Sequence, residues 1–194
     1  MTGASGVGKD TIRAAALPQL DNLYYSISMT TREQRPGEID GVNYHYLSLA
    51  QFEQHIENDE FVEWAEYVGD YYGTPIAPVE AALERGEDVL LELELVGARQ
   101  VMRRMPEAVK LFIAPPSMTE LESRLRGRGT DSEERIQRRL ERAREEILAI
   151  PEFDYLIVNE EVDQAVHDFL AIIHAERRKT HLYKSAELTA ILER

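Results

Sequence analysis

The 194-residue chain has no cysteine, no long apolar run and no excess of basic residues. Without cysteine it can build neither a disulfide framework nor a thiolate metal site, which fits a reducing compartment. No stretch approaches the roughly 18 apolar residues of a membrane span, and no signal peptide precedes the first glycines. We therefore expect a cytoplasmic protein without a membrane span.

The charge balance excludes two classes of partner. The chain has 36 acidic and 22 basic residues, which gives a formal net charge of −14. Nucleic acids and anionic membrane surfaces both require a basic face, so we expect neither as a partner. Any anionic small molecule must instead be bound by a local cluster of basic residues. The length allows one large domain, or a core with a lobe, with a well-buried interior.

The first eleven residues have the spacing of a phosphate-binding loop that runs into a helix. Glycines let the backbone N–H groups point inward, Lys9 adds a cation, and the helix N-terminus adds partial positive charge. The motif G-x-x-x-x-G-K-[ST] is matched through Lys9, but Asp10 stands where a hydroxyl normally holds magnesium. A glycine-rich turn before an ordinary helix is the alternative. The pattern predicts a nucleotide phosphate site formed by Gly3, Ala4, Ser5, Gly6, Val7, Gly8, Lys9, Asp10 and Thr11.

Helix and strand patterns alternate along most of the chain. Such alternation indicates an α/β protein, with a parallel sheet between helices. The predicted helices are 11–20 (interrupted by Pro18), 78–85, 97–105, 118–126, 133–148 and 162–178, with another within 180–194, and the predicted strands are 24–28, 89–95, 109–114 and 155–159.

Residues 30–74 interrupt this alternation and predict a strand-rich lobe. Its first part, 30–44, reads as a functional loop in which Arg32, Arg35 and Tyr44 suit a phosphate, although exposed surface is the alternative. A helix at 49–58, a strand at 61–67 and a turn at 71–75 follow.

Three acids interrupt apolar strands. Glu63 shares its predicted strand face with Phe61, so it is either a carboxylate in a pocket or the sign of a miscounted register. Glu92 and Glu94 alternate near the carboxyl end of the strand 89–95, where open α/β sheets bind ligands. An edge strand with a solvated face is the alternative for this pair.

A basic segment stands out in the acidic chain. Residues 124–144 carry eight arginines against four acids, on two helices that read as a lid. For Arg135, Arg138, Arg142 and Arg144 we favour a solvated helix face with i,i+4 ion pairs.

Taken together, these motifs resemble guanylate kinase, of the P-loop nucleoside monophosphate kinase superfamily. The likeness covers Gly3 to about Ile173 and includes, in order, Gly3 to Thr11, Thr30-Thr31-Arg32, Arg35-Pro36-Gly37-Glu38, Asp40-Gly41, Tyr44, Phe61-Val62-Glu63, Tyr72-Gly73-Thr74, Gly97-Ala98 and the segment 124–132. It implies an α/β P-loop NTPase fold, with a three-layer α/β/α parallel sheet, an inserted GMP-binding lobe and a helical lid. The implied core is 1–29 and 75–194, with the lid at about 117–145 and the lobe at 30–74.

The resemblance also implies an activity and its residues. The activity is transfer of the γ-phosphoryl group of ATP to GMP, and to dGMP, with Mg²⁺, by a monomer or homo-oligomer. The implied catalytic residues are Lys9, Arg124, Arg128 and Arg139, and the implied metal ligands are Asp10 and Thr11. The implied substrate residues are Arg32, Arg35, Tyr44 and Tyr72 for the GMP phosphate, Ser28, Glu63, Thr74 and Glu94 for guanine, and Glu38 and Glu92 beside them.

Chemistry supports the assignment of the guanine residues. The Glu63 carboxylate can accept from the N1–H and the exocyclic amine of guanine together, and the Thr74 hydroxyl can donate to O6. Adenine offers the wrong pattern of donors and acceptors.

The chain departs from the family at three places. Asp10 replaces Ser or Gly and either binds magnesium or weakens ATP binding by repulsion. Glu94 stands where Asp is usual, which lengthens the side chain by one methylene. Only Met1 and Thr2 precede Gly3, so we expect the first central strand to be absent, its neighbours to be left unpaired, and the natural start to lie upstream.

Two other functions fit parts of the pattern. A ribose 1,5-bisphosphate phosphokinase-like enzyme often has Gly-Lys-Asp, as here, but has no need of Glu63 and Thr74. A catalytically inactive guanylate-kinase-like binding module usually loses loop residues, whereas Lys9 is kept.

Overall fold

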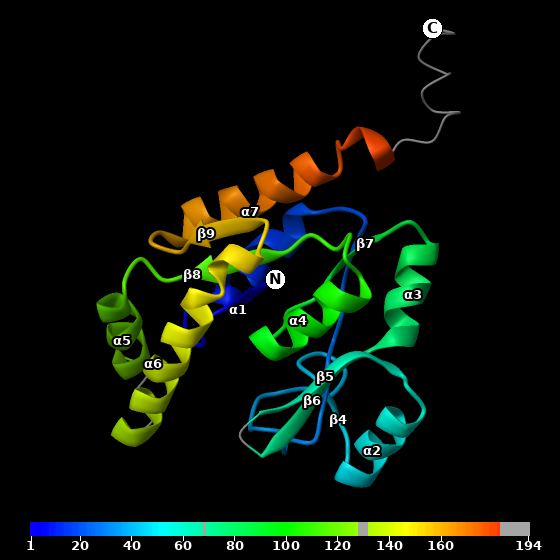
Figure 1. Ribbon diagram of the computed structural model, residues 1–194, viewed down its shortest axis with the longest axis horizontal. Helices are drawn as coiled ribbons and strands as arrows, with labels where there is room; N and C mark the ends of the chain where they lie inside the picture. Colours follow the sequence, from blue (N-terminus) through cyan, green and yellow to red (C-terminus); the bar gives the residue numbers. More distant parts are fainter. Residues whose placement is uncertain (68, 128–131, 183–194) are drawn as a thin grey trace, which may run out of the picture.

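The computed structural model describes residues 1–67, 69–127 and 132–182. Within these residues the core contains parallel strands with helices on both faces, which confirms the predicted α/β class (Figure 1). Strand β1 pairs with β8, β8 with β9, and β2 with β7, all in parallel. These strands are β1 (Thr2–Gly3), β2 (Leu23–Tyr25), β7 (Asp88–Leu90), β8 (Leu111–Ala114) and β9 (Tyr155–Val158).

The helices of the core lie on two sides of these strands. Helix α1 packs against α7, which also contacts β9, while α4 contacts β1 and α3 contacts β7 (Figure 1). These helices are α1 (Lys9–Ala16), α3 (Ile76–Glu84), α4 (Leu95–Arg104) and α7 (Val162–Glu176). None of the described helices is long and apolar enough to cross a membrane.

The first strand, expected to be absent, is present in a short form. Thr2 and Gly3 pair with Phe112 and Ile113 of β8. On the other side the Met1 nitrogen donates to the Leu91 carbonyl at 2.8 Å, and the Leu93 N–H donates to the Met1 carbonyl at 3.0 Å. The prediction that both neighbours are left unpaired is therefore wrong, because Met1 to Gly3 bridge β8 and the segment that follows β7.

One apolar cluster supports the phosphate loop. Ile12 of α1, Ile113 of β8 and Phe169 of α7 are almost fully buried and belong to the same cluster as Val7 of the loop. Ile12 and Ala16 are the buried residues of α1 and lie four apart, which is the spacing of one helix face. Val7 thus anchors the loop to the core, while Gly6 and Gly8 are only partly buried.

Two further helices pack on each other at one end of the core. They are α5 (Met118–Gly127) and α6 (Glu133–Leu148), within one residue of the predicted bounds. Each buries an apolar stripe, with Leu121 and Leu125 on α5 and Leu140 and Ala143 on α6.

Short 3₁₀ segments stand where the sequence predicts helix ends. The predicted break at Pro18 is a 3₁₀ turn over Leu17–Gln19, and others cover Ile150–Glu152 and Thr180–Leu182. The rest of the helix expected within 180–194 lies outside the described residues.

A separate four-stranded sheet is formed by residues 29–75 (Figure 1). Its order is β4-β3-β6-β5, with β3 parallel to β4 and antiparallel to β6. The elements are β3 (Met29–Thr30), β4 (His45–Tyr46), α2 (Leu49–Glu57), β5 (Phe61–Tyr67) and β6 (Asp70–Pro75). Ser48 and Gln51 form a capping box that starts α2.

The prediction of a turn at 71–75 is wrong, because these residues belong to strand β6. Residues Tyr71 to Pro75 pair with β5 instead of turning away from it. Aromatic and β-branched residues favour strands, and here their pairing outweighs the turn signal of Gly73 and Pro75.

A β-bulge in β5 redirects Glu63. Phe61 pairs with Pro75 and Glu63 with Thr74, so Val62 is an extra residue between them. Phe61 stacks on Phe52 of α2 with ring centroids 4.5 Å apart, whereas Val62 belongs to the cluster packed on α4. All three residues Phe61, Val62 and Glu63 are buried. The prediction that Glu63 shares its face with Phe61 is wrong, because the bulge breaks the alternation between them.

The predicted core strands differ from the structure in limits or burial. Strand β2 covers Leu23–Tyr25 instead of 24–28, and β8 covers Leu111–Ala114 instead of 109–114. Strand β7 ends at Leu90, so Glu92 and Glu94 follow the strand instead of alternating within it, and Leu95, predicted to end the strand, starts α4. Strand β9 is less buried than predicted, because it is the last strand of its described sheet and leaves Leu156 47% and Val158 46% exposed.

Candidate functional site

The loop between β1 and α1 has the backbone of an anion site. Gly6 and Gly8 have φ of 94° and 96°, in the left-handed region that favours glycine. Helix α1 begins directly after Gly8, so its free N–H groups and dipole face the loop. The Lys9 amine reaches back to donate to the Gly3 carbonyl at 2.7 Å. This arrangement can bind phosphate through backbone donors and one cation.

The loop opens into a cavity of about 300 Å³. Its lining joins the loop to α5 and to the start of α7, which places basic and amide groups beside the glycines. The lining residues are Gly6, Val7, Gly8, Thr11, Arg124, Gly127, Asn159 and Val162.

Asn159 is a site residue that sequence reasoning missed. It follows β9, is 1% exposed, and donates from Nδ2 to the Val7 carbonyl at 2.7 Å. Its Oδ1 has no hydrogen-bond partner among the described residues. A polar residue directly after a strand, at the carboxyl edge of a parallel sheet, was the available signal.

We expect Gly8→Ala to disturb this cavity more than an ordinary left-handed glycine would. An added Cβ would lie 2.6 Å from Asn159 Nδ2, in addition to the strain at positive φ. Unfolding free energy should fall by about 1 to 3 kcal/mol in urea titrations, with weaker binding of a nucleotide triphosphate. Gly86→Ala is the matched control, because Gly86 has φ 76° and no neighbour within 4 Å. Equal effects of both variants on nucleotide binding would contradict the role given to this contact.

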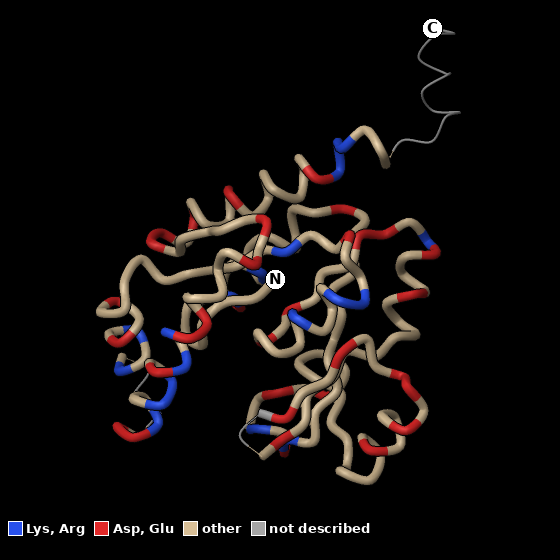
Figure 2. Tube along the Cα trace, in the orientation of Figure 1, with Lys and Arg blue, Asp and Glu red and all other residues tan. Residues whose placement is uncertain are grey.

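Two predicted arginines reach the loop from α5 and α6. Arg124 donates from Nη1 to the Asn159 carbonyl at 2.9 Å and pairs with Glu120. Arg139 donates from Nη2 to Ser5 Oγ at 2.8 Å, which ties α6 directly to the phosphate loop. Figure 2 shows the basic residues gathered on this helix pair. The third, Arg128, lies outside the described residues.

Arg142 corrects the prediction of a wholly solvated face. Its Nε lies 3.1 Å from Glu146 and its Nη2 lies 3.5 Å from Glu94, so it links α6 to the start of α4. Glu146 is only 2% exposed and was missed by sequence reasoning. Burial raises the pKa of Glu146, and the negative charge of Glu94 raises it further. Its place three residues after buried Ala143 was the available signal.

Glu92 and Asp10 lie around Arg13 of α1. Arg13 Nε is 3.1 Å from Glu92 Oε2 and its Nη2 is 2.9 Å from Asp10, while its guanidinium stacks over the Tyr25 ring. The Glu92 contact lacks hydrogen-bond geometry, and Oε2 accepts no hydrogen bond among the described residues. Burial raises the pKa of Glu92, although the Lys9 charge opposes this. The Asp10 side chain is 84% exposed.

In the loop 30–44, Glu38 organises the arginine cluster. It accepts both Nη2 contacts of Arg32, at 2.8 and 3.0 Å, and the backbone N–H of Arg35. The hydrogen bond from Arg32 lowers the pKa of Glu38 to about 2, and those from Arg35 and Tyr46 act in the same direction. Arg32 also lies over the Tyr44 ring. The Arg35 residue itself is exposed.

Two tyrosines, Tyr44 and Tyr72, connect this arginine cluster to strand β6. The Tyr44 and Tyr72 rings meet edge to face, with centroids 5.8 Å apart. Burial raises the pKa of Tyr44 to about 12, so it is a neutral donor at neutral pH. Ser28 directly precedes β3, and its carbonyl accepts a hydrogen bond from the His45 N–H.

Glu63 and Thr74 form a buried polar pair across the β5–β6 hairpin. They are 6% and 1% exposed, and Thr74 Oγ1 donates to Glu63 Oε1 at 2.7 Å. Burial raises the pKa of Glu63 to about 7, although the hydrogen bonds from Thr74 oppose it. The Thr74 hydroxyl proton points to Glu63, so both side chains offer acceptor oxygens to a third group. The predicted donation from Thr74 to guanine O6 is not available in this arrangement, because the hydroxyl proton is already used.

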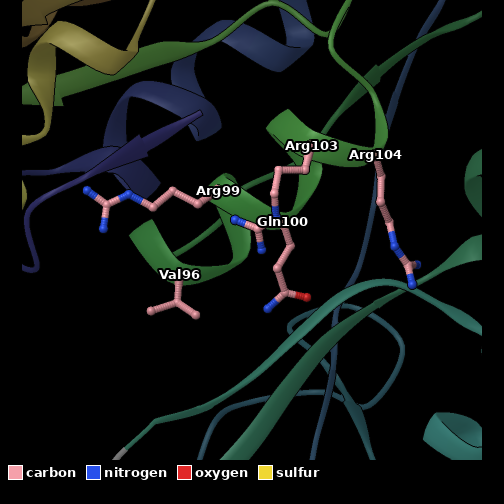
Figure 3. A pocket seen from close by; sticks show the side chains of 5 residues that line it. All are labelled: Val96, Arg99, Gln100, Arg103 and Arg104. Carbon is pink, nitrogen blue, oxygen red and sulfur yellow. The ribbon is translucent and has the colours of Figure 1, made fainter.

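A second cavity, of about 390 Å³, lies along α4 (Figure 3). Its lining is Val96, Arg99, Gln100, Arg103 and Arg104. Arg99 pairs with Glu152, and Arg104 pairs with Asp59 and with backbone carbonyls, so much of this positive charge is already compensated. None of these residues was predicted to belong to a site.

A short parallel strand that leads into a glycine loop and a helix N-terminus, with arginines from a helix pair beside it, defines a P-loop NTPase fold. The family model described as "Guanylate kinase" matches residues 1–176. The chain belongs to the guanylate kinase family.

Individual relatives support this membership. The chain is 58% identical to a guanylate kinase of Thermus thermophilus, over 93% of this chain and 81% of that protein. It is 52% identical to one of Carboxydothermus hydrogenoformans, over 92% and 88%. The fold is similar to the crystal structure of guanylate kinase from Anaplasma phagocytophilum, with a TM-score of 0.77 and 33% identity over 92% of this chain and 86% of that chain.

Proposed function

We propose that this chain transfers the γ-phosphoryl group of ATP to GMP, and to dGMP, to give ADP and the nucleoside diphosphate. Membership of the guanylate kinase family supports the reaction. The observation that carries the choice of acceptor is the buried Glu63–Thr74 pair, because its acceptor oxygens complement the N1–H and exocyclic amine of guanine. In this proposal residues 30–74 form the acceptor lobe on a core of 1–29 and 75–194, with a lid at about 117–145.

The donor side stabilises charge on the transferred group. Phosphoryl transfer needs positioning and electrostatic stabilisation more than covalent catalysis. The loop N–H groups and Lys9 hold the donor phosphates, while Arg124 and Arg139 bring positive charge to the loop from α5 and α6. Arg128 has the same role by its position in the family motif.

The acceptor phosphate is held by residues of the loop 30–44 together with Tyr72 of β6. Arg32 and Arg35 supply guanidinium donors, and Tyr44 and Tyr72 supply phenolic donors. The ionised carboxylate of Glu38 orients Arg32, which fixes the guanidinium plane before the phosphate arrives. Ser28 and Glu94 are the remaining residues that we assign to the guanine base.

The predicted metal ligands Asp10 and Thr11 fit magnesium, and Glu92, predicted as a substrate residue, offers a further carboxylate. Mg²⁺ prefers oxygen ligands and is usually bound through one or two carboxylates together with substrate phosphates. Glu92 Oε2, which accepts no hydrogen bond among the described residues, and the exposed Asp10 carboxylate match that preference, and Thr11, the next residue along the chain from Asp10, offers a hydroxyl. Among the described residues no group of three or more His, Cys, Asp or Glu side chains could hold a metal without the phosphates. When bound, the ion would neutralise charge on the ATP phosphates.

We expect GMP binding to weaken as pH falls through about 7. Only the ionised Glu63 carboxylate accepts both guanine N–H groups, and burial raises the pKa of Glu63 to about 7. The site is therefore ionised at pH 8.5, and one pH unit below the pKa the affinity should fall about tenfold. Calorimetric titration of GMP between pH 5.5 and 8.5 measures the profile, and Glu63→Gln should flatten it. An identical pH profile in wild type and Glu63→Gln would show that Glu63 does not titrate against the ligand.

A coupled assay of ADP formation tests the function itself. GMP, AMP, UMP and ribose 1,5-bisphosphate are offered separately with ATP and Mg²⁺, and the product is identified by chromatography. We expect rapid ADP formation only with GMP, and GDP as the second product. Preference for the sugar phosphate would identify the ribose 1,5-bisphosphate phosphokinase alternative. No turnover, with retained GMP binding, would identify an inactive binding module.

A further inference from the structure

Helix α4 meets the Glu63 carboxylate at Gly97. A Cβ added at Gly97 would lie 2.8 Å from Glu63 Cδ and closer still to Oε2. Both distances are shorter than ordinary van der Waals contact, so a side chain at 97 cannot coexist with the present position of the carboxylate. Gly97 is in the first turn of the helix, where glycine is intrinsically unfavourable relative to alanine. The close approach to Glu63 offers a reason for glycine at this position.

Two more residues on the same helix hold the strand on either side of Glu63. Gln100 donates from Nε2 to the Trp64 carbonyl at 2.6 Å and accepts from the Trp64 N–H at 3.4 Å. Arg104 donates from Nη1 to the carbonyls of Phe61 at 2.6 Å and Val62 at 3.2 Å. Figure 3 shows Gln100 and Arg104 extending from α4 toward the β5–β6 hairpin.

These contacts join one face of α4 to the bulge in β5. Positions 97, 100 and 104 are i, i+3 and i+7, so they lie on the same side of α4. Val62 is the extra residue of the bulge, with no partner on β6, and Arg104 satisfies its carbonyl. Backbone groups before and after Glu63 are thus bonded to α4, and the side chain between them rests on Gly97.

We propose that Gly97, Gln100 and Arg104 are positioning residues that set where the Glu63 carboxylate stands in the acceptor pocket. Gly97 defines how far the carboxylate retracts toward α4, while Gln100 and Arg104 hold the bulged backbone that aims it. The inference rests on the proposed function, in which Glu63 accepts from guanine. It adds a determinant of base recognition outside the residues that touch the base.

Gly97→Ala separates this role from a general structural one. The group that the new methyl meets is the end of a flexible side chain, so the carboxylate moves while α4 keeps its fold. Displacement of a binding group by about 1 Å can cost as much as 10²-fold, and we expect the KM for GMP to rise about tenfold or more. The KM for ATP should stay within about twofold, and the melting temperature should not fall, since alanine favours helix over glycine.

Two further variants sharpen the test. Val96→Ala changes a half-exposed neighbour on α4 and serves as the matched control, with no expected change in GMP use. Glu63→Asp shortens the acid by one methylene, so Gly97→Ala should have a smaller effect in that background than in wild type. GMP binding can be followed by the fluorescence of Trp64, the sole tryptophan of the chain, beside Glu63.

The outcomes distinguish the inference from the function on which it rests. A rise in the GMP KM with Gly97→Ala alone, reduced in the Glu63→Asp background, supports the positioning role. If Glu63→Gln raises the GMP KM but Gly97→Ala leaves it within about twofold, the inference is overturned and the function stands. A loss of ATP use or of melting temperature with Gly97→Ala overturns the inference as well. If Glu63→Gln itself has no effect on GMP, the proposed guanine recognition fails.

Discussion

Lys9→Ala should lower kcat by about 10²-fold or more, because removal of one preorganised charge from a phosphoryl-transfer site typically costs that much. The Lys9 amine donates to the Gly3 carbonyl at 2.7 Å within the phosphate loop, and Lys9 is not a member of the described apolar core clusters. The fold should therefore be kept, with an unchanged circular dichroism spectrum and melting temperature. Single-turnover ADP formation at saturating GMP measures the chemical step directly.

Lys179→Ala is the matched control for this variant. Lys179 pairs with Glu176 near the end of α7 and lies outside the phosphate loop. Its removal should leave kcat within about twofold, since exposed ion pairs contribute little. A Lys9→Ala protein that keeps more than about a tenth of wild-type turnover would contradict the role assigned to the loop.

Glu63→Gln should raise the KM for GMP about 10-fold to 10²-fold. The amide places an N–H group against a guanine donor, and each buried group left unpaired costs about 1 to 3 kcal/mol. The ATP side of the reaction should be unaffected, because Glu63 lies in the β5–β6 hairpin and not in the phosphate loop. Steady-state kinetics with GMP varied at saturating ATP measures the effect.

The same strand supplies the control for Glu63→Gln. Glu66 is exposed on β5, so Glu66→Gln makes the same chemical change outside the pocket. It should leave the GMP KM unchanged. Equal KM values for Glu63→Gln and wild type would show that the carboxylate does not read the base.

The parts of the fold with strong local signals were predictable. The α5–α6 pair and α2 follow from clear apolar periodicity, and helix α1 begins at the lysine of the loop motif. Strand β5 matches the predicted range 61–67, because alternation over several residues is a strong strand signal.

Features that depend on partners distant in the sequence were not predictable. The bulge at Val62 and strand β6 arise from pairing between β5 and β6, which no local pattern reveals. Met1 to Gly3 enter the core through two hydrogen bonds to the segment after β7 and through the pairing of Thr2 and Gly3 with β8, although their own strand signal is weak.

The residues of the candidate site also differ in whether the local sequence reveals them. Lys9 and the glycines are recognisable because a motif sets their spacing, whereas Asn159 joins the site only through a contact across the fold. Arg142 illustrates why: its i,i+4 pair with Glu146 is visible in the sequence, but its contact with Glu94 depends on how α6 lies against α4.

The most direct test of the account is the ratio of kcat/KM for GMP to that for AMP, with inosine monophosphate as a third acceptor. A site built to bond particular base groups rejects an analogue without them by about 10⁴-fold or more, and we predict this preference for GMP over AMP. Inosine monophosphate keeps the N1–H but lacks the exocyclic amine, so it should fall between the two. Comparable values for GMP and AMP would contradict the claim that Glu63 and Thr74 select guanine.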